Sequence, residues 1–421
     1  MNTFAMRLQM LTAVLFAIAF AVLPSVGYTN EKPTDYDIEL AQIHKDIAEL
    51  KGRAFTHPIK VEKVTKFIDL LYRQASLTGD PADFTVAKTA IDNASRQIGA
   101  WEELYLLKAN LNFKFHRLSD TRDDLTMVKD LADSSQVKTL NADLALQEGR
   151  YEDAREGYED VIRKNRTWDN LARLAYLKSK TGDVSGAEKL YLDAQVEITA
   201  KEMRSFSWVE LQRGLLDFNC GRHEDALAHY RRANRAYSGY WLVEAYIAEV
   251  FGAQRKFDNA VALFETVIAR TAKPELQQAL GDLYVFMGKP NQAKPWHEKA
   301  LATYLASAQR GEVLYFHHLA GFYADVREDG AEAVKWARRD LELRKNFATH
   351  DALAWALYRD GQFINAIDEM NTALSSGVRD AHLFFHAAMI HLAAGRTEEG
   401  KQFLRQAAEV NPHVETFHAH H

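Results

Sequence analysis

The segment Gly-Arg-Tyr-Glu-Asp-Ala, residues Gly149–Ala154, decides the fold of this 421-residue chain because variants of it return at near-regular spacing. The same glycine and alanine positions recur in Gly182–Ala187, Gly221–Ala226, Gly288–Ala293 and Gly361–Ala366. Glycine adopts the left-handed backbone that ends a helix, and alanine lets the next helix approach closely. The first two glycines are 33 residues apart, and a fixed period in this range is typical of a stacked array of helix pairs.

Large and small side chains follow each alanine at helical spacing. Tyr158 and Tyr191 come four positions after their alanines, and Ala194 comes three positions after Tyr191. Spacings of three and four place these side chains on one helical face. The order of small residue, tyrosine or leucine, glycine, alanine, tyrosine, alanine and proline resembles the signature of the tetratricopeptide repeat family, down to Asn411-Pro412 after the last expected helix.

The resemblance covers about two-thirds of the chain, as about eight units in residues 135–412. It implies an all-α, right-handed superhelical solenoid of antiparallel helix pairs. Two units lack the turn glycine but keep the alanine, at Ala260 and Ala333. We assign residues 28–134 to N-terminal capping helices and degenerate repeats, beginning with a capping helix at Asp35–Leu50, and residues 413–421 to a histidine-rich tail.

The first 27 residues have the features of a secretory signal peptide. Arg7 precedes an apolar run from Leu8 to Leu23, and small residues lead up to Gly27. We expect cleavage near Gly27 and Tyr28, and a mature protein of bacterial type in the periplasm or the medium, with no membrane span after cleavage. The alternative is an uncleaved anchor, for which the apolar run is short.

Composition and motifs argue against nucleic-acid binding and against catalysis. The net charge is −6 and the basic residues form no stripe, which argues against a nucleic-acid ligand. Cys220 is the only cysteine, so no intramolecular disulfide forms. The chain has no dinucleotide or phosphate loop, no nucleophile elbow and no His-Glu-x-x-His motif. We therefore predict a protein that is not an enzyme.

The tetratricopeptide resemblance implies that the first helix of each unit lines a concave groove. Carrying the family's groove-facing positions over to this chain identifies these candidates: Tyr176, Trp208, Tyr315, His318, Phe322, Asp351, Trp355, Tyr358 and Arg359. Aromatic side chains are common anchors in recognition sites. We predict a scaffold that binds a peptide or protein partner and needs no cofactor. The alternative is that several of these aromatics fill the centre of a tightly wound superhelix.

Histidines concentrate toward the C-terminus, where eleven of the 16 follow Pro295. His382 and His386 are four residues apart on one expected helix, a spacing that lets two imidazoles share a metal. The tail adds His413, His418, His420 and His421. Imidazole suits zinc, copper and nickel, so the alternative function is an exported metal-binding or metal-handling accessory protein. The competing interpretation is that the pair is packed and the tail is a frayed end.

Overall fold

The computed structural model describes residues 32–56, 59–99 and 101–419. The predicted signal peptide, together with His420 and His421, lies outside these residues. The chain divides into a short unit, Met1–Pro33, and a large unit, Thr34–His421. Within the described ranges, the large unit consists of helices and their connections and contains no strand. None of the helices in those ranges is long and apolar enough to cross a membrane.

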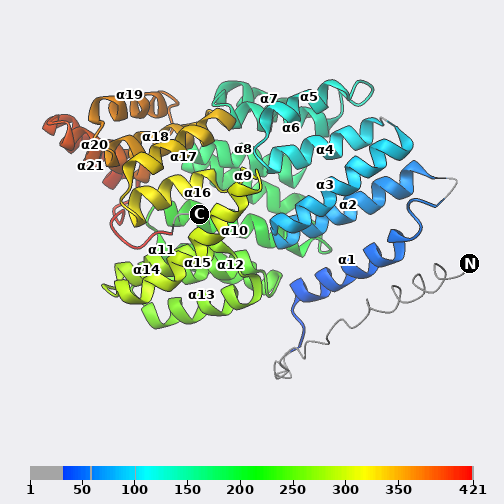
Figure 1. Cartoon of the computed structure of the whole chain (residues 1–421), viewed down its shortest axis with the longest axis horizontal. Coiled ribbons are helices and arrows are strands. Elements are labelled where there is room, and N and C mark those ends of the chain that lie inside the picture. Colours follow the sequence, from blue (N-terminus) through cyan, green and yellow to red (C-terminus); the bar gives the residue numbers. More distant parts are fainter. Residues whose placement is uncertain (1–31, 57–58, 100, 420–421) are drawn as a thin grey trace, which may run out of the picture. The chain divides into compact units, whose positions relative to one another are not determined.

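Helix pairs follow one another along the large unit (Figure 1). The N-terminal part comprises α1 (Asp35–Lys51), the pair α2 (Val61–Thr78) and α3 (Pro81–Ile98), and the pair α4 (Glu102–Lys114) and α5 (Leu118–Thr126). Eight pairs follow: α6 (Ser135–Gln147) and α7 (Tyr151–Lys164), α8 (Trp168–Lys180) and α9 (Val184–Glu197), α10 (Met203–Asn219) and α11 (His223–Ala236), α12 (Trp241–Ala253) and α13 (Phe257–Thr271), α14 (Pro274–Phe286) and α15 (Pro290–Gln309), α16 (Phe316–Gly321) with its π-helical continuation η1 (Phe322–Val326) and α17 (Gly330–Leu343), α18 (Phe347–Arg359) and α19 (Phe363–Leu374), and α20 (Ala381–Ala393) and α21 (Thr397–Val410). The prediction of an all-α array of helix pairs is confirmed.

The pair α10 and α11 shows why the repeated residues produce this arrangement. Gly221 has a φ of +75° and ends the first helix, a conformation that costs an L-residue about 1–2 kcal/mol. Ala226 and Tyr230 on the second helix are fully buried. A β-carbon on Gly214 of the first helix would lie only 2.2 Å from the Tyr230 ring. The small residue on one helix therefore makes the space that the tyrosine of the other helix fills.

The array coils so tightly that helix pairs about 200 residues apart touch one another. The Ser238 hydroxyl donates to Asp35 Oδ2 at 2.6 Å across 203 residues. Lys180, at the end of α8, contacts Asp380, just before α20, at 3.1 Å across 200 residues. Because α8 and α20 are six pairs apart in the chain, six pairs make one turn of the coil.

Turn glycines of the earlier pairs provide the contact points between successive turns. Gly149 lies directly against the backbone of Lys345, and Gly182 lies against the side chain of Arg379. By contrast, Gly361, the corresponding turn glycine of a late pair, has no atom within 4 Å of where a β-carbon would stand. The glycine thus ends a helix in all three pairs. In the two earlier pairs, it also contacts the next turn of the coil.

Candidate functional site

A cavity of about 850 Å³ lies among the helix pairs. Its lining comes mainly from the first helices of the pairs, as the resemblance implied. These helices contribute Tyr176 from α8, Phe218 from α10, Tyr246 from α12, His318 from α16, Trp355 from α18 and His382 from α20. Gln278 of α14 also lines the cavity, so it is a groove with side chains from seven successive pairs, and we call it the inner groove.

Four of the predicted groove residues line this cavity: Tyr176, His318, Asp351 and Trp355. Tyr176 is 39% exposed. The Trp355 ring is stacked on His386, with 4.0 Å between ring centroids and 11° between planes. Its Nε1–H donates to Asp325 at 2.9 Å. The tryptophan is thus held in one orientation, with its ring against the groove.

Tyr315 and Phe322 were expected on the groove, but the structure places them in the core between neighbouring pairs. Both are buried, and their rings pack on Tyr304 at centroid distances of 4.9 and 6.5 Å. Tyr315 is the residue just before α16, and Phe322 follows the last residue of α16 with α-helical backbone angles, φ −61° and ψ −44°. Packing against Tyr304 accounts for the burial of both rings.

Three other candidates also lie outside the cavity lining. Trp208 packs edge-on against the first residue of α8, at 5.9 Å between ring centroids. Tyr358 packs against Phe363 at 6.1 Å. Arg359 Nε donates to the backbone carbonyl of Ala324 at 2.8 Å. In this position Arg359 joins α18 to η1.

The described histidines of the candidate metal set all line the inner groove: His382, His386, His413 and His418. The His382 and His386 rings are 4.0 Å apart between centroids, and His386 Nδ1 lies 2.9 Å from Asp351 Oδ1. Within the described part of the chain, no group of three or more histidine, cysteine, aspartate or glutamate side chains is arranged to hold a metal ion.

The residues after α21 enter the inner groove, which the sequence did not indicate. From here on, the tail is taken to begin at Asn411, directly after α21, and it is described as far as Ala419. Phe417 is buried among apolar side chains of α12, α13 and α14, and its ring centroid lies 5.8 Å from that of Phe286. A β-carbon on Gly252 would come within 2.5 Å of the Phe417 ring. The absence of a side chain at this position of α12 makes room for the phenyl group.

Glu249 of α12 holds the end of the tail. Its Oε1 accepts the backbone N–H of Ala419 at 2.8 Å and lies 2.9 Å from His418 Nδ1. The carboxylate is only 1% exposed, whereas the His418 side chain is 45% exposed and stacks on Phe218. Burial lowers the pKa of His418, but the charge and hydrogen bond of Glu249 outweigh it, so the pKa is raised above 6.5.

Lys180 and Asp380 form an ion pair on the wall of the groove. Burial disfavours the charged form of both groups, but the opposite charge of the partner outweighs this effect in each case. The Asp380 carboxylate raises the pKa of Lys180, and the Lys180 ammonium lowers the pKa of Asp380. Asp380 also accepts the N–H groups of His382 at 3.0 Å and Leu383 at 3.3 Å. One carboxylate therefore caps α20 and joins it to α8 of the preceding turn.

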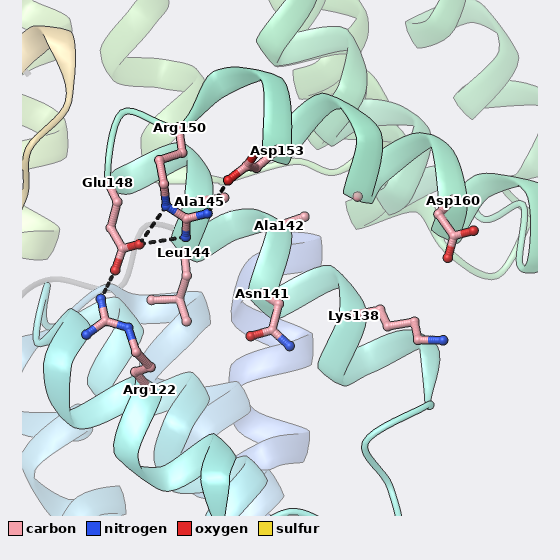
Figure 2. Close-up of a pocket in the computed structure, with 11 residues that line it drawn as sticks. Arg122, Lys138, Asn141, Ala142, Leu144, Ala145, Glu148, Arg150, Asp153 and Asp160 are labelled. Carbon is pink, nitrogen blue, oxygen red and sulfur yellow. Dashed lines mark hydrogen bonds and ion pairs between the residues drawn. The ribbon is translucent and has the colours of Figure 1, made fainter.

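A second recess, of about 530 Å³, lies between α5, α6 and α7 (Figure 2). Four of its charged side chains pair with one another, and the other two, Lys138 and Asp160, pair with residues outside the recess. Arg150 contacts Glu148 at 2.7 Å, and Glu148 also contacts Arg122. Exposed pairs of this kind contribute about 0–1 kcal/mol each. Ion pairing accounts for these charges, so the inner groove is the stronger candidate site.

The fold is an array of helix pairs, and the inner groove lies among them. Residues 381–414, which comprise α20, α21 and the start of the tail, match the tetratricopeptide repeat family. This last helix pair is therefore similar to the tetratricopeptide repeat, and the pairs before it carry the same recurring glycine, alanine and tyrosine positions. No curated protein matches the chain in sequence.

Three solved structures resemble this chain at low sequence identity. A crystal structure of MamA is 18% identical, with 40% of this chain and 96% of that chain covered and a TM-score of 0.32. The APC/C hetero-tetramer Cut9-Hcn1 is 15% identical, with 90% and 80% covered and a TM-score of 0.42. A tetratricopeptide repeat protein from Parabacteroides merdae is 15% identical, with 61% and 98% covered and a TM-score of 0.39. At these identities the likeness concerns the fold alone.

Proposed function

We propose that this protein is a non-enzymatic, extracytoplasmic scaffold that binds an extended segment of a peptide or protein in the inner groove. The observation that carries this proposal is the tail, since the groove already holds a stretch of polypeptide. Phe417 fills an apolar pocket, and the residues after it bind a buried carboxylate. These are the interactions by which a groove recognises a peptide: a buried aromatic anchor, a charged contact and a backbone hydrogen bond.

The remaining groove surface supports the same function. Tyr176 and Trp355 present aromatic area beside the tail, and Asp351 adds a carboxylate. Aromatic side chains bury a large area and lose few rotatable bonds on binding, which makes them effective anchors. A partner segment would contact these side chains from several helix pairs at once.

Partner capture tests this proposal. Immobilised protein is exposed to periplasmic extract or medium of the native host, and bound proteins are identified by mass spectrometry. A specific partner should be retained by the wild-type chain and by Trp101→Ala, whose tryptophan is exposed on an N-terminal helix pair, and should be lost from Tyr176→Ala/Trp355→Ala. Retention by this last variant would place the binding surface outside the inner groove.

The extracytoplasmic location rests on the leader at residues 1–27. A fusion of the first 34 residues to a reporter that works only outside the cytoplasm should be active. Mature protein from the native host should begin near Tyr28. An intact Met1 on that protein would contradict cleavage, and its retention in the membrane would indicate an anchor.

The alternative function is metal binding by the C-terminal histidines. The observation that favours it is the gathering of His382, His386 and His418 in one groove, with ring centroids of His382 and His418 6.4 Å apart. Zinc, copper(II) and nickel are the metals to test.

A further inference from the structure

We propose that the tail is a built-in competitor for the inner groove, and that the partner displaces it with a segment in which a cationic side chain follows an aromatic one. This inference rests on the proposed peptide-binding function and names the chemistry of the partner. The tail sequence Phe417-His418-Ala419 then serves as an internal copy of the recognised segment.

The aromatic requirement follows from the pocket around Phe417. Gly252 and Leu283 form its walls. A β-carbon on Gly252 would stand 2.5 Å from a ring carbon of Phe417 and 3.2 Å from Leu283 Cδ1. The phenyl ring occupies the space that the missing side chain leaves. A displacing segment must refill this space, because an emptied apolar pocket loses its packing contacts.

The cationic requirement follows from Glu249. This carboxylate is almost fully buried and receives two contacts from the tail, one from the His418 ring and one from the Ala419 backbone. A buried carboxylate that loses two such contacts is destabilised. An incoming segment therefore has to supply replacements, and a positively charged side chain next to a free backbone N–H supplies both.

The attachment of the tail is limited, which makes displacement feasible. Its first part makes local hydrogen bonds, from His413 N to Asn411 Oδ1 and from Thr416 N to the His413 carbonyl, and packs against the turn between α10 and α11, where the His413 and His223 ring centroids lie 5.4 Å apart. Within residues 411–419, only Phe417 and Ala419 are buried. The tail follows α21 without a further helix, so it can leave the groove while the last helix pair stays packed. Because it is tethered, its effective concentration at the groove is high, and it competes even when its intrinsic affinity is modest.

A labelled peptide with the sequence of residues 411–421 tests the proposal by fluorescence anisotropy. The chain ending at Val410 should bind this peptide, and the full chain should bind it at least about tenfold more weakly, because the tethered copy occupies the site. Glu249→Gln in the shortened chain should lower the affinity about tenfold or more. Glu244→Gln is the matched control, since Glu244 lies on the same helix and pairs with Arg270 instead; it should leave the affinity unchanged.

A second variant keeps every tail residue and avoids truncation. Gly252→Ala in the full chain places a methyl group where the Phe417 ring lies, so it should release the tail and remove hydrogen-exchange protection from the Ala419 amide. Gly321→Ala is the control, because nothing lies within 4 Å of its added carbon. Equal protection of Ala419 in both variants would overturn the proposal, as would a folded, shortened chain that fails to bind the peptide.

These outcomes are separable from failure of the proposed function. If the peptide does not bind in trans but partner capture still depends on Tyr176 and Trp355, the tail is a structural cap and only this inference fails. If capture is also independent of those residues, the proposed groove function fails as well. If the peptide binds and competes with the captured partner, both stand.

Discussion

A β-carbon on Gly149 would lie 2.5 Å from the carbonyl oxygen of Lys345, a residue nearly two hundred positions further along the chain. The turn that ends α6 therefore supports the segment that leads into α18. Asn346 strengthens this contact by donating to the Gln147 side chain at 3.0 Å. Successive turns of the array thus stabilise each other directly, in addition to the packing between neighbouring pairs.

Substitution of Gly149 by alanine should measure this contact. Gly361→Ala is a matched control, because the two glycines have φ values of +75° and +76° and share the cost of a left-handed alanine, while Gly361 faces open space. We expect Gly149→Ala to lower the free energy of unfolding by about 1–3 kcal/mol more than Gly361→Ala, as for overpacked sites. Urea unfolding followed by circular dichroism measures the difference. Equal losses of stability in the two variants would show that the contact between Gly149 and Lys345 does not stabilise the coil.

The contrast between Gly149 and Gly361 also shows how far the sequence predicts the fold. Both glycines sit in the same repeated segment, and both end a helix, because that conformation depends on local backbone preferences. Of these two glycines, only Gly149 touches another turn of the coil. Contacts across about 200 residues depend on the summed rotation between pairs, and no local pattern records that quantity. Helix pairs could therefore be predicted, whereas the close approach of successive turns could not.

The Lys180–Asp380 pair should contribute more to stability than a surface ion pair does. Lys180→Met should cost about 2 kcal/mol, within the range for hydrogen bonds to charged groups. Asp380→Ala should cost about 3 kcal/mol, because it also removes the cap of α20. Lys178→Met is the control on the same helix. Its contact with Asp183 is partly exposed and should be worth less than about 1 kcal/mol. Thermal unfolding of the three variants tests this order.

The pH dependence of the same pair follows from its pKa shifts. The pKa of Asp380 is lowered from 3.8, so its contribution is present above 3.8 and is lost as the pH falls below that value. The pKa of Lys180 is raised from 10.5, so its contribution is present below 10.5 and is lost as the pH rises further. Lys180 also opposes the charge on His418, so the stability difference between wild type and Lys180→Met should be constant only above the range in which His418 titrates and below 10.5. A difference that changes near about pH 9 would contradict this assignment.

Trp355 should be an anchor for the partner. Trp355→Ala removes an aromatic surface that is fixed against His386, and it should weaken partner binding by about 2 kcal/mol or more, as expected for a buried anchor. Trp101→Ala removes an equally large side chain from an exposed position on the N-terminal pairs and should have no effect on binding. Calorimetry with the captured partner measures both. Unchanged far-ultraviolet circular dichroism confirms that each variant remains folded.

The positions of Trp355 and Phe322 show how far the groove could be predicted. Trp355 lies on α18 and lines the cavity, at a position that the resemblance implied. Phe322 directly follows α16, and its ring packs on Tyr304 in the core instead. The tail escaped prediction for another reason. Phe417 is a single aromatic residue among histidines, and its pocket is made by residues more than a hundred positions earlier.

Binding of the tail peptide to the chain ending at Val410 should weaken as the pH rises. The raised pKa of His418 means that its contribution is complete below 6.5 and is lost as the pH rises through the pKa of the bound state. Glu249 and Asp380 favour this charge, whereas Lys180 opposes it, and His382 lies nearby on α20. A peptide with Gln in place of His418 isolates the effect, because the protein groups titrate equally in both experiments. The two peptides should differ more at about pH 6 than at about pH 8; parallel profiles would exclude a charged His418 in the groove.

Metal titration separates the peptide scaffold from the alternative function. Nδ1 of His386 is already 2.9 Å from Asp351, and the described residues contain no group of three ligands arranged for a metal. We therefore expect zinc, copper(II) and nickel to bind untagged protein no more tightly than about micromolar, near −8 kcal/mol. Any weak binding should decrease as the pH falls through about 6.5, because imidazole must be neutral to coordinate. A tight, stoichiometric site would establish the alternative. Its loss on removing residues 413–421, or on changing His382 and His386 to alanine, would then locate the metal in the tail or on α20.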